Sequence, residues 1–418
     1  MLDLRLIRRD PDGVRAALAR RGDGAGLDRV LELDARRRDI LPRLEGLRAQ
    51  QNEANQAIAA AKKAGEGADE AIATMKAVAA EAKALGEELA QVDADLMPAL
   101  AQLPNLPAES AAPQDTVIRI VGEPRVPAEW ARDHLELAGD RIDMERGARL
   151  SGSRFAYLRG DLVRLELALV SWVLDLLGGH GFQPVIPPVL VREEALFGTG
   201  FLPDTEQQIY RLADDDLYLV GTSEVALASL HAGEILDGEA LPLRYAGYSP
   251  CFRREAGAAG KDTRGIFRVH QFDKVEMFSF VTPDASNDEH EFLLAREEEI
   301  LTALEIPYRV VNIAVDDLGA SAAKKYDCEA WLPSQGRYRE LTSTSNTTDY
   351  QARRLEVRYR PAGGGKAETV HTLNGTAVAV GRTIIALLEN GQQQDGSVVL
   401  PAVLRPYGAP ELLAPASG

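Results

Sequence analysis

Two arginines occupy positions that suit phosphate binding. Arg253 lies in CFRREAG, at the end of an expected strand, before a glycine-rich charged loop that returns in RGIFRVHQFDKVEMF. Arg382 lies in HTLNGTAVAVGRTIIALLEN, where a polar strand runs into an apolar helix. Arginine carries a permanent charge and a planar fork of donors that matches phosphate oxygens. Either arginine alone is more often a surface ion pair, but together they favour a phosphate-bearing ligand.

The common phosphate-binding and catalytic motifs are absent. The segment AGAAGKDT is not a P-loop, because Asp262 follows Gly260 and Lys261 and because Glu255 stands where the first glycine should be. No GxGxxG follows a strand, and HExxH, GxSxG and zinc-type Cys/His spacings are all missing. The sequence therefore argues against the two common nucleotide-binding folds and against a zinc site.

Two heptad patterns in the first quarter of the chain predict long helices. In each pattern apolar residues recur every seven positions, with further apolar residues interleaved as in a coiled coil. The first seam is Leu33, Ile40, Leu47, Ala54 and Ala61 with Val30, Leu44 and Ile58; the second is Met75, Ala82, Leu89 and Leu96 with Val78, Leu85 and Val92. The AGEG segment at 64–67 breaks the pattern, so we expect an antiparallel hairpin with arms on the order of 50 Å long.

We expect Pro98, Pro104 and Pro107 to end this hairpin. From the pattern alone its role stays open between a solvated dimerisation rod, a spacer and a binding arm.

After residue 110, short β-rich runs alternate with helical stretches. The runs are VIRIV, LYLV, FRVHQF, KVEMFSFV and YRVVNIAV, and the helical stretches cover 162–177 and 288–304. This pattern indicates an α+β domain on a mostly antiparallel sheet. We therefore expect two domains, residues 1–107 and 108–418, and a disordered tail after Gly408.

Composition excludes several classes of protein. The chain has 418 residues, 45% of them hydrophobic and 27% charged, and can bury a sizeable core. The net charge of -17 argues against non-specific coating of nucleic acid, although a local basic face remains compatible with it. Cys251 and Cys328 cannot form a disulfide framework and fit a reducing compartment. No apolar run approaches roughly eighteen residues and no secretory signal is visible, so we expect a soluble, cytoplasmic protein with no membrane partner.

Three segments resemble the motifs of class II aminoacyl-tRNA synthetases. They are GFQPVIPP at 181–188, CFRREAG with its returning VHQFDKVEMF strand, and NGTAVAVGRTIIALLEN. Within that class the chain resembles bacterial-type seryl-tRNA synthetases, through the hairpin and through the segments VGTSEVAL and RELTSTSN. The resemblance covers nearly the whole chain. It implies an N-terminal tRNA-binding coiled-coil arm over 1–107 and a class II catalytic domain over 108–418.

The resemblance implies an ATP site. Arg253 and Arg382 would be the catalytic residues, Arg253 on the α-phosphate and Arg382 on the γ-phosphate. Glu255 would lie near the adenine amino group, between walls formed by Val269 and Phe272. The full implied ATP-binding set is Arg253, Arg254, Glu255, Val269, Phe272, Glu340, Leu341, Thr342, Ser343 and Arg382.

The resemblance also implies that Glu340 and Ser343 hold Mg²⁺ against the phosphates. Carboxylate and hydroxyl oxygens are hard ligands of the kind that Mg²⁺ takes together with phosphate and water. Without the family, Glu340 is equally well explained by an ion pair with Arg337 or Arg339.

The implied serine-binding set is Thr222, Ser223, Glu224, Arg253, Glu276, Asn374 and Thr376. The two glutamates would supply negative charge for the ammonium group and an acceptor for the hydroxyl, while Arg253 would meet the carboxylate. Buried polar groups of this kind reject an analogue that lacks the hydroxyl. The chain departs from many relatives at Thr376 and Ala377, where serine and glycine are common. The hydroxyl is kept, and we expect a slightly smaller pocket.

In the implied reaction, the carboxylate of L-serine attacks the α-phosphorus of ATP and gives seryl-adenylate and pyrophosphate. The 3′-terminal hydroxyl of tRNA(Ser), and of tRNA(Sec) as well, then takes the seryl group. Too few residues follow Arg382 for a C-terminal anticodon-binding domain, so tRNA would be selected by the arm, with further contact from the loop after Arg253. The candidate arm cations are Arg36, Arg37, Arg38, Arg43, Arg48, Lys62, Lys63, Lys76 and Lys83. The family also implies a homodimer through the GFQPVIPP segment.

Other interpretations stay open. The chain could be a non-housekeeping paralogue, either an inhibitor-resistant second copy or a catalytically silent RNA-binding regulator. A ligase that aminoacylates carrier proteins is a further alternative, although such relatives lack a long arm.

Overall fold

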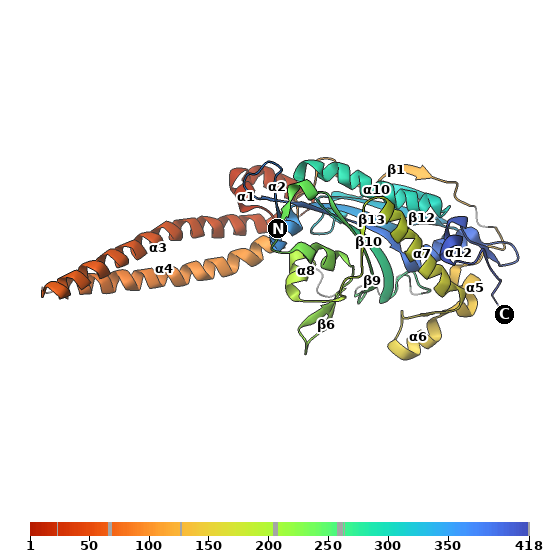
Figure 1. Cartoon of the computed structure of the whole chain (residues 1–418), viewed down its shortest axis with the longest axis horizontal. Coiled ribbons are helices and arrows are strands. Elements are labelled where there is room, and N and C mark those ends of the chain that lie inside the picture. Colours follow the sequence, from red (N-terminus) through yellow and green to blue (C-terminus); the bar gives the residue numbers. More distant parts are fainter. Residues whose placement is uncertain are drawn as a thin grey trace. The chain divides into compact units, whose positions relative to one another are not determined.

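The computed structural model describes residues 1–22, 24–65, 69–125, 128–203, 208–256, 262 and 264–416. The chain divides into two compact units, one of Leu2–Leu103 and one of Met1 with Pro104–Gly418 (Figure 1). Both cysteines, Cys251 and Cys328, are free and buried. None of the helices in the described ranges has the length and apolarity needed to cross a membrane.

The first unit is the expected helical hairpin, preceded by two short helices. Asp10 caps the second short helix by accepting a hydrogen bond from the Gly13 N–H at 3.0 Å, and Pro11 takes the first helical position, where no N–H is needed. The hairpin itself pairs one helix of 40 residues with one of 34. The four helices are α1 (Leu4–Arg9), α2 (Pro11–Arg20), α3 (Ala25–Ala64) and α4 (Asp69–Gln102).

The heptad seams pack most tightly at the base of the hairpin. Val30, Ile40 and Leu44 on α3 are buried, as are Leu85 and Leu96 on α4. None of the described residues within 45–81 is buried. The seam continues there as small or half-buried side chains, so the apolar contact between α3 and α4 decreases toward the turn. Residues 66–68 of the expected AGEG turn lie outside the described residues.

The expected end at Pro98 was wrong, because α4 continues through this proline to Gln102. A proline inside a helix removes one backbone hydrogen bond. Leu96, Leu100 and Ala101 are buried on either side of it, and this packing compensates for the lost bond.

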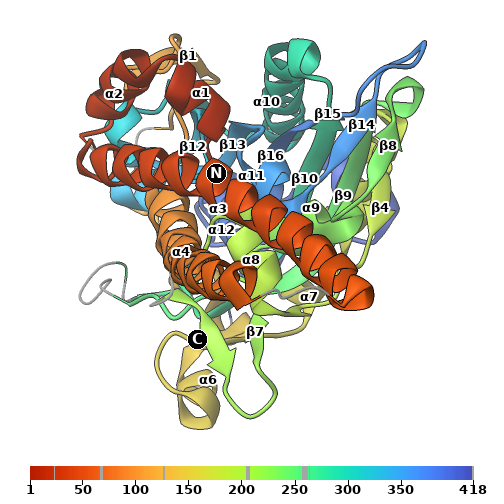
Figure 2. The same ribbon diagram turned by 90° about the vertical axis from the view of Figure 1, so that its left-hand side faces the viewer.

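The second unit is built on an eight-stranded sheet in the order β1-β11-β12-β13-β16-β10-β9-β4. All neighbouring pairs are antiparallel except β4 with β9, so the expected mostly antiparallel sheet is confirmed. Figure 2 shows the strands from β12 to β4 side by side. The strands are β1 (Thr116–Val121), β4 (Gln183–Val185), β9 (Leu243–Phe252), β10 (Gln271–Val281), β11 (Tyr308–Asn312), β12 (Lys324–Leu332), β13 (Arg337–Thr348) and β16 (His371–Ala379).

Three helices cover one face of this sheet: α7 (Asp161–Gly179), α10 (Ser286–Ala303) and α12 (Val380–Gly391). Side chains alternate between the two faces of a strand. On β10, Val275 and Met277 therefore enter the core under these helices, while Lys274 and Glu276 point to the other face. The functional site lies on that second face.

Short elements complete the second unit. Two of them position site residues: α9 (Glu224–Ala228) begins within the VGTSEVAL segment, and α5 (His134–Ala138) lies beside the loop that follows β9. Two small three-stranded sheets have the orders β5-β7-β6 and β15-β14-β8. Their strands are β5 (Leu190–Val191), β6 (Tyr210–Leu212), β7 (Leu217–Leu219), β8 (Ile235–Asp237), β14 (Arg358–Arg360) and β15 (Glu368–Thr369). The remaining elements that bear on the site are α8 (Glu193–Thr199) and α11 (Tyr350–Leu355).

The expectation of a disordered tail after Gly408 was wrong. Leu412–Leu413 forms β18, which pairs with β17 (Val398–Val399), and Leu413 is fully buried. Alanine and proline dominate the tail, but burial of one large apolar side chain contributes roughly 1.5–3 kcal/mol and holds it in place.

The run FRVHQF is only partly a strand. Residues 267–270 lie outside any strand, and β10 begins at Gln271. These four residues belong to the loop between β9 and β10, and backbone groups among them contact Arg253 and Arg382.

Candidate active site

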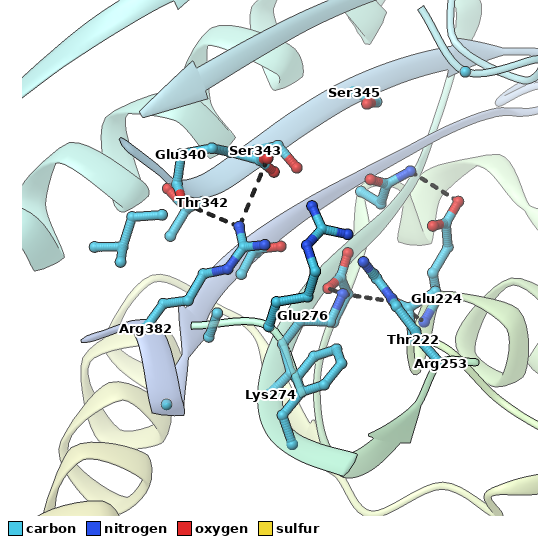
Figure 3. A pocket seen from close by; sticks show the side chains of 18 of the residues that line it. Thr222, Glu224, Arg253, Lys274, Glu276, Glu340, Thr342, Ser343, Ser345 and Arg382 are labelled. Atoms are coloured by element: carbon cyan, nitrogen blue, oxygen red, sulfur yellow. Dashed lines mark hydrogen bonds and ion pairs between the residues drawn. The ribbon is translucent and has the colours of Figure 1, made fainter. Parts of the chain in front are cut away.

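One cavity of about 370 Å³ opens on the face of the sheet that the three helices leave free. Figure 3 shows its two ends, with Arg382, Glu340 and Ser343 at one and Thr222, Glu224 and Glu276 at the other. Nearly all the site residues expected from the sequence line it: Thr222, Glu224, Arg253, Glu255, Val269, Phe272, Glu276, Glu340, Leu341, Thr342, Ser343, Asn374, Thr376 and Arg382.

Two of the expected residues do not contribute a side chain to this cavity. Ser223 is fully buried and donates its hydroxyl to the Gly247 carbonyl at 3.2 Å. Arg254 has an exposed side chain, and its backbone N–H bonds to the Gln208 carbonyl at 2.9 Å. Both residues directly follow a residue that lines the cavity, but their own side chains are not part of its lining.

Arg382 lies in the first turn of α12 and is held at the polar end of the cavity by four groups. Its Nη1 donates to the Glu340 carbonyl at 3.0 Å and lies 3.6 Å from the Glu340 carboxylate. Its Nε donates to the Phe267 carbonyl at 3.4 Å, and its guanidinium carbon lies 4.6 Å from the centre of the Phe267 ring. Burial and neighbouring arginines leave this cation short of counter-charge, which suits an anionic ligand.

Arg253 lines the cavity close enough to both ends for its charge to act on Glu224 at one and on Glu340 at the other. Its Nε donates to the Gly221 carbonyl at 3.2 Å, and its guanidinium carbon lies 5.3 Å from the centre of the Phe272 ring. The aromatic ring and one carbonyl fix the arginine, and the other donors of its fork have no hydrogen-bond partner among the described residues, so they are available to a ligand.

A β-bulge brings Glu340 and Ser343 to the same face of β13. In a regular strand, residues three apart point to opposite faces. Here Cys328 of β12 pairs with Thr342 and Glu329 pairs with Glu340, so Leu341 is an extra residue. The bulge re-aims the strand, and both polar side chains line the cavity.

The surroundings of Glu340 favour its ionised form. Burial alone would raise the pKa of this carboxyl, but the positive charges of Arg382, Lys325 and Arg253 outweigh burial and hold the pKa below its usual value. Asp327, directly opposite Ser343 on β12, behaves differently: burial raises its pKa to about 7 although Lys325 lies 2.9 Å away.

The other end of the cavity is lined by carboxylate and amide side chains, which suit a small polar ligand. Glu224 accepts hydrogen bonds from Gln351 Nε2 at 2.8 Å and Asn374 Nδ2 at 2.9 Å through the same oxygen. Burial, and then the negative charge of Glu276, raise the pKa of Glu224 to about 7.

Lys274 is a site residue that the sequence interpretation missed. It is 5% exposed, its Nζ donates to the Thr222 hydroxyl at 2.7 Å, and it forms a close ion pair with Glu276. Period-two alternation could have found it, because residues two apart on a strand share a face. Lys325 and Arg268 also line the cavity and were likewise missed.

Of the two residues expected to narrow the pocket, Thr376 lies where its methyl group could do so and Ala377 does not. Thr376 lines the cavity, whereas Ala377 is 1% exposed within the core cluster. On β16, Thr376 pairs with Glu276 and Val378 with Val275, so Ala377 is the extra residue of a bulge. Its methyl group therefore takes no volume from the pocket.

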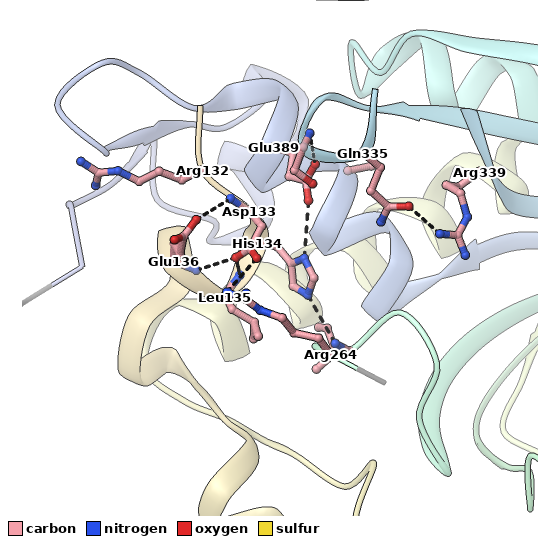
Figure 4. A network of polar contacts seen from close by, with 12 residues as sticks. Arg132, Asp133, His134, Leu135, Glu136, Arg264, Gln335, Arg339 and Glu389 are labelled. Carbon is pink, nitrogen blue, oxygen red and sulfur yellow. Dashed lines mark hydrogen bonds and ion pairs between the residues drawn. The ribbon is translucent and has the colours of Figure 1, made fainter. Parts of the chain in front are cut away.

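The loop after β9 is held at its returning end by a polar network (Figure 4). His134 receives the Ile266 N–H at Nε2 (3.4 Å), and its Nδ1 lies 3.5 Å from Glu389. Arg264 pairs with Asp133 at 2.9 Å. These contacts fix the backbone just before Phe267, on which Arg382 rests. Residues 257–261 and 263 of this loop lie outside the described residues.

Glu255 is tied to the same loop. It adopts a positive φ of 51° and forms an ion pair with Arg268. This arrangement places its carboxylate at the cavity wall beside Val269 and Phe272.

Two protein families match the chain. The seryl-tRNA synthetase N-terminal domain matches residues 1–107, and the class II tRNA synthetase core domain (G, H, P, S and T) matches residues 208–391. The serine–tRNA ligase of Thermobifida fusca is 51% identical over 423 residues, which cover 99% of each chain.

Solved structures agree with these matches. Seryl-tRNA synthetase from Pyrococcus horikoshii complexed with ATP superposes with a TM-score of 0.94 at 42% identity and covers 100% of both chains. The cytoplasmic serine–tRNA ligase of Naegleria fowleri in complex with AMP gives a TM-score of 0.87 at 33% identity, covering 99% of this chain and 98% of the other.

Proposed function

The chain belongs to the seryl-tRNA synthetase family, the class II ligases that use ATP to join serine to tRNA, and from that premise we propose how its residues divide the work. The observation that carries the proposal is the single cavity with an arginine-rich end and a carboxylate-rich end, joined by Arg253. A phosphate chain and a small amino acid can meet in it.

At the arginine-rich end, ATP would be held by its phosphates and its base. Arg253 would bind the α-phosphate and Arg382 the γ-phosphate, while Phe272 and Val269 would face the adenine and Glu255 its amino group. Arg382 supports this assignment because it is fixed by Glu340 and Phe267 yet lacks a full counter-charge. Arg254 and Ser223 would contribute only through their backbones.

Mg²⁺ fits the same end if phosphates supply part of its coordination. Glu340, with its lowered pKa, and the Ser343 hydroxyl offer two hard oxygens on one face of β13. Among the described residues no cluster of three or more acidic, His or Cys side chains is placed to cage a metal ion. When bound, Mg²⁺ would neutralise charge on the phosphates.

At the carboxylate-rich end, L-serine would be bound by Thr222, Glu224, Glu276, Asn374 and Thr376. Glu276 would accept the serine hydroxyl, and Glu224 would attract the ammonium group. Arg253 would orient the serine carboxylate toward the α-phosphorus.

The reaction needs no nucleophile from the protein. The serine carboxylate attacks the α-phosphorus and pyrophosphate leaves, and the adenylate then transfers serine to the tRNA 3′ end. The protein contributes position and charge, through Arg253 and Arg382, in a cavity lined by fixed dipoles.

We assign tRNA(Ser), with tRNA(Sec) as a second acceptor, to the arm and to the loop after β9. Five of the candidate arm cations already pair with carboxylates of the hairpin, for example Arg36 with Glu88 at 2.6 Å and Arg37 with Asp93 at 2.7 Å. The other three pairs are Arg38 with Asp34, Arg43 with Glu81 and Lys83 with Glu87. Arg48, Lys63 and Lys76 have exposed side chains with no carboxylate partner in the described part of the hairpin, so they are the best phosphate ligands. The side chain of Lys62 lies outside the described residues.

A homodimer fits the exposed apolar side chains around the GFQPVIPP segment. Ile186, just after β4, is 82% exposed, and Leu167 and Val163 on α7 are 56% and 40% exposed. Contiguous exposed apolar residues mark protein interfaces more often than free surface. A cytoplasmic location fits the two free, buried thiols.

The test is ATP–pyrophosphate exchange measured with each of the twenty amino acids, followed by charging of tRNA(Ser) and tRNA(Sec). We expect exchange that depends on serine and charging of both tRNAs. A catalytically silent regulator would bind tRNA without exchange. An inhibitor-resistant copy would show the same exchange but keep it in the presence of a serine-mimicking inhibitor.

A further inference from the structure

We propose that Lys274 is the positioning residue that makes this pocket selective for a hydroxyl-bearing amino acid, because it fixes which of its polar neighbours donates and which accepts. The inference rests on the proposed function. It concerns a lysine that lines the cavity and contacts both Thr222 and Glu276.

Lys274 decides the role of the Thr222 hydroxyl. A hydroxyl oxygen has two lone pairs and one hydrogen. Lys274 Nζ donates to this oxygen at 2.7 Å, and the backbone N–H of Glu224 donates to it at 3.3 Å. Both lone pairs are therefore occupied, and no acceptor among the described residues takes the hydrogen. Thr222, which is 3% exposed and lines the cavity, must present that hydrogen to a ligand oxygen.

Lys274 also decides the role of Glu276. The two side chains form an ion pair that is almost fully buried, with side-chain exposures of 7% and 3%. A carboxylate that is paired with an ammonium group carries no hydrogen of its own, so it can only accept hydrogen bonds from a ligand. The wall thus presents one donor and one acceptor side by side, and this matches a substrate with both an O–H and oxygen acceptors.

Glu224 is a second buried carboxyl of the pocket, and it has no lysine bonded to it among the described residues. Its partners are the neutral amides of Gln351 and Asn374, and the cations Lys274 and Arg253 act on it only from a distance. The two buried carboxyls of the pocket are therefore inequivalent: Glu276 is bound to a cation, and Glu224 is not. The lysine assigns hydroxyl recognition to Glu276.

Alanine in this pocket would leave Glu276 without a donor, whereas serine supplies one. Loss of a single buried hydrogen bond changes an equilibrium by roughly five- to a hundredfold. Without Lys274, the donor role of Thr222 and the acceptor role of Glu276 are no longer fixed. The preference for serine over alanine should therefore decrease.

The experiment is ATP–pyrophosphate exchange with serine and alanine for the wild type and for Lys274→Met in the full chain. We expect the variant to raise the KM for serine and to lower the serine-over-alanine ratio of kcat/KM, each by about tenfold or more. The KM for ATP should stay within about twofold. A wild-type ratio in the variant, or an equal rise in the KM for ATP, overturns the inference.

Lys324→Met is the matched control. Lys324 is also largely buried on the same sheet, but it stacks on Tyr326, with Nζ 4.6 Å from the ring centre, and lies outside the cavity. We expect it to keep the wild-type ratio. If this control also loses the ratio, the effect is general to buried lysines of the sheet and the proposal for Lys274 fails.

Lys274→Met leaves a buried carboxylate without its cation and can unfold the chain. The double variant Lys274→Met with Glu276→Gln removes both charges; we expect it to melt near the wild-type temperature while discriminating poorly. Full discrimination in this folded variant overturns the inference. A double-mutant cycle with Thr222→Val should be strongly non-additive if Lys274 acts through Thr222, and additivity refutes that route. If the wild type itself shows no serine-dependent exchange, the proposed function fails first.

Discussion

Gly265 lies directly against the ring of His134, so closely that a Cβ at this position would be 2.0 Å from His134 Nε2. The glycine also adopts a φ of +79°, which side-chain-bearing residues rarely adopt. The next residue, Ile266, donates its N–H to the same ring nitrogen. Two separate constraints therefore require glycine at position 265: the lack of space for a side chain and the positive φ. The backbone conformation at this glycine directs the chain toward Phe267.

We expect Gly265→Ala to impair ATP use more than overall stability. The added methyl group must displace His134 or the Ile266 backbone, and either shift moves the Phe267 carbonyl that holds Arg382. The measurement is ATP–pyrophosphate exchange, with an expected loss of roughly tenfold or more. Gly336→Ala is the control, since Gly336 also has a positive φ of 59° but an open surrounding. Equal losses in the two variants would show that only backbone strain matters.

Arg382→Ala should reduce pyrophosphate exchange by about 10²–10³ without unfolding the chain, because one preorganised charge contact is lost. Circular dichroism would monitor the fold, and Arg405→Ala provides a surface control in an ion pair with Glu411. An unchanged exchange rate would return Arg382 to the status of a structural ion pair with Glu340.

Shortening the arm should affect the two steps of the reaction differently: formation of seryl-adenylate should continue, and transfer of serine to tRNA should stop. The ion pairs Arg36–Glu88 and Arg43–Glu81 show which levels of α3 and α4 face each other, so residues 47–77 can be replaced by a short turn that keeps both pairs. We expect normal serine-dependent exchange and loss of tRNA charging. Normal charging by the shortened chain would contradict the assignment.

A triple substitution of Arg48, Lys63 and Lys76 to alanine tests the charges in the intact arm. We expect weaker tRNA binding and a shallower dependence on salt, since each phosphate contact contributes to the salt slope. Neutralising Arg36, which is already paired with Glu88, should have a smaller effect.

Serine use should depend on pH through Glu224. Its pKa of about 7 lies above the ordinary value of 4.5, so the ionised form that attracts the serine ammonium group accumulates as pH rises through 7. We expect kcat/KM for serine to rise over this range and Glu224→Gln to abolish the rise. Asp327→Asn is the control, because Asp327 also has a pKa of about 7 but is paired with Lys325, away from the serine end.

The same raised pKa affects stability with the opposite trend. A carboxyl whose pKa is higher in the folded chain stabilises the fold below the unfolded value, and this contribution is lost as pH rises through the folded pKa. Relative to Glu224→Gln, the wild type should therefore lose up to about 3 kcal/mol between pH 4.5 and 7, seen as a falling difference in Tm.

Glu276→Ala should lower the preference for serine over alanine more than it weakens ATP binding, because Glu276 lies at the serine end beside Thr222 and Lys274. Adenylate formation with each amino acid at fixed ATP measures this. If the variant kept its preference while ATP affinity fell, Glu276 would belong to the nucleotide site.

Local patterns were enough to predict the hairpin and to place Arg382 where a strand runs into a helix. Heptads and period-two runs involve only residues that are close in the sequence, so they can be recognised without knowing the fold. The partners of those residues were not predictable in this way. Alternation along β10 places Lys274 on the same face as Glu276, but its contact with Thr222 follows only from how β10 lies in the sheet against the start of α9. The bulge at Leu341, which aligns Glu340 with Ser343, depends on the register between β12 and β13. The tail was misjudged because its composition hides one buried leucine, Leu413.

The distribution of burial along the arm has a consequence for hydrogen exchange. Apolar contact is concentrated near Val30, Ile40 and Leu96, while none of the described residues within 45–81 is buried. The free energy needed to open a helical turn must therefore decrease from the base toward the turn, and amide protons should exchange progressively faster in that direction. The turn end of the hairpin can then open and re-form while the packed base of the two helices stays closed.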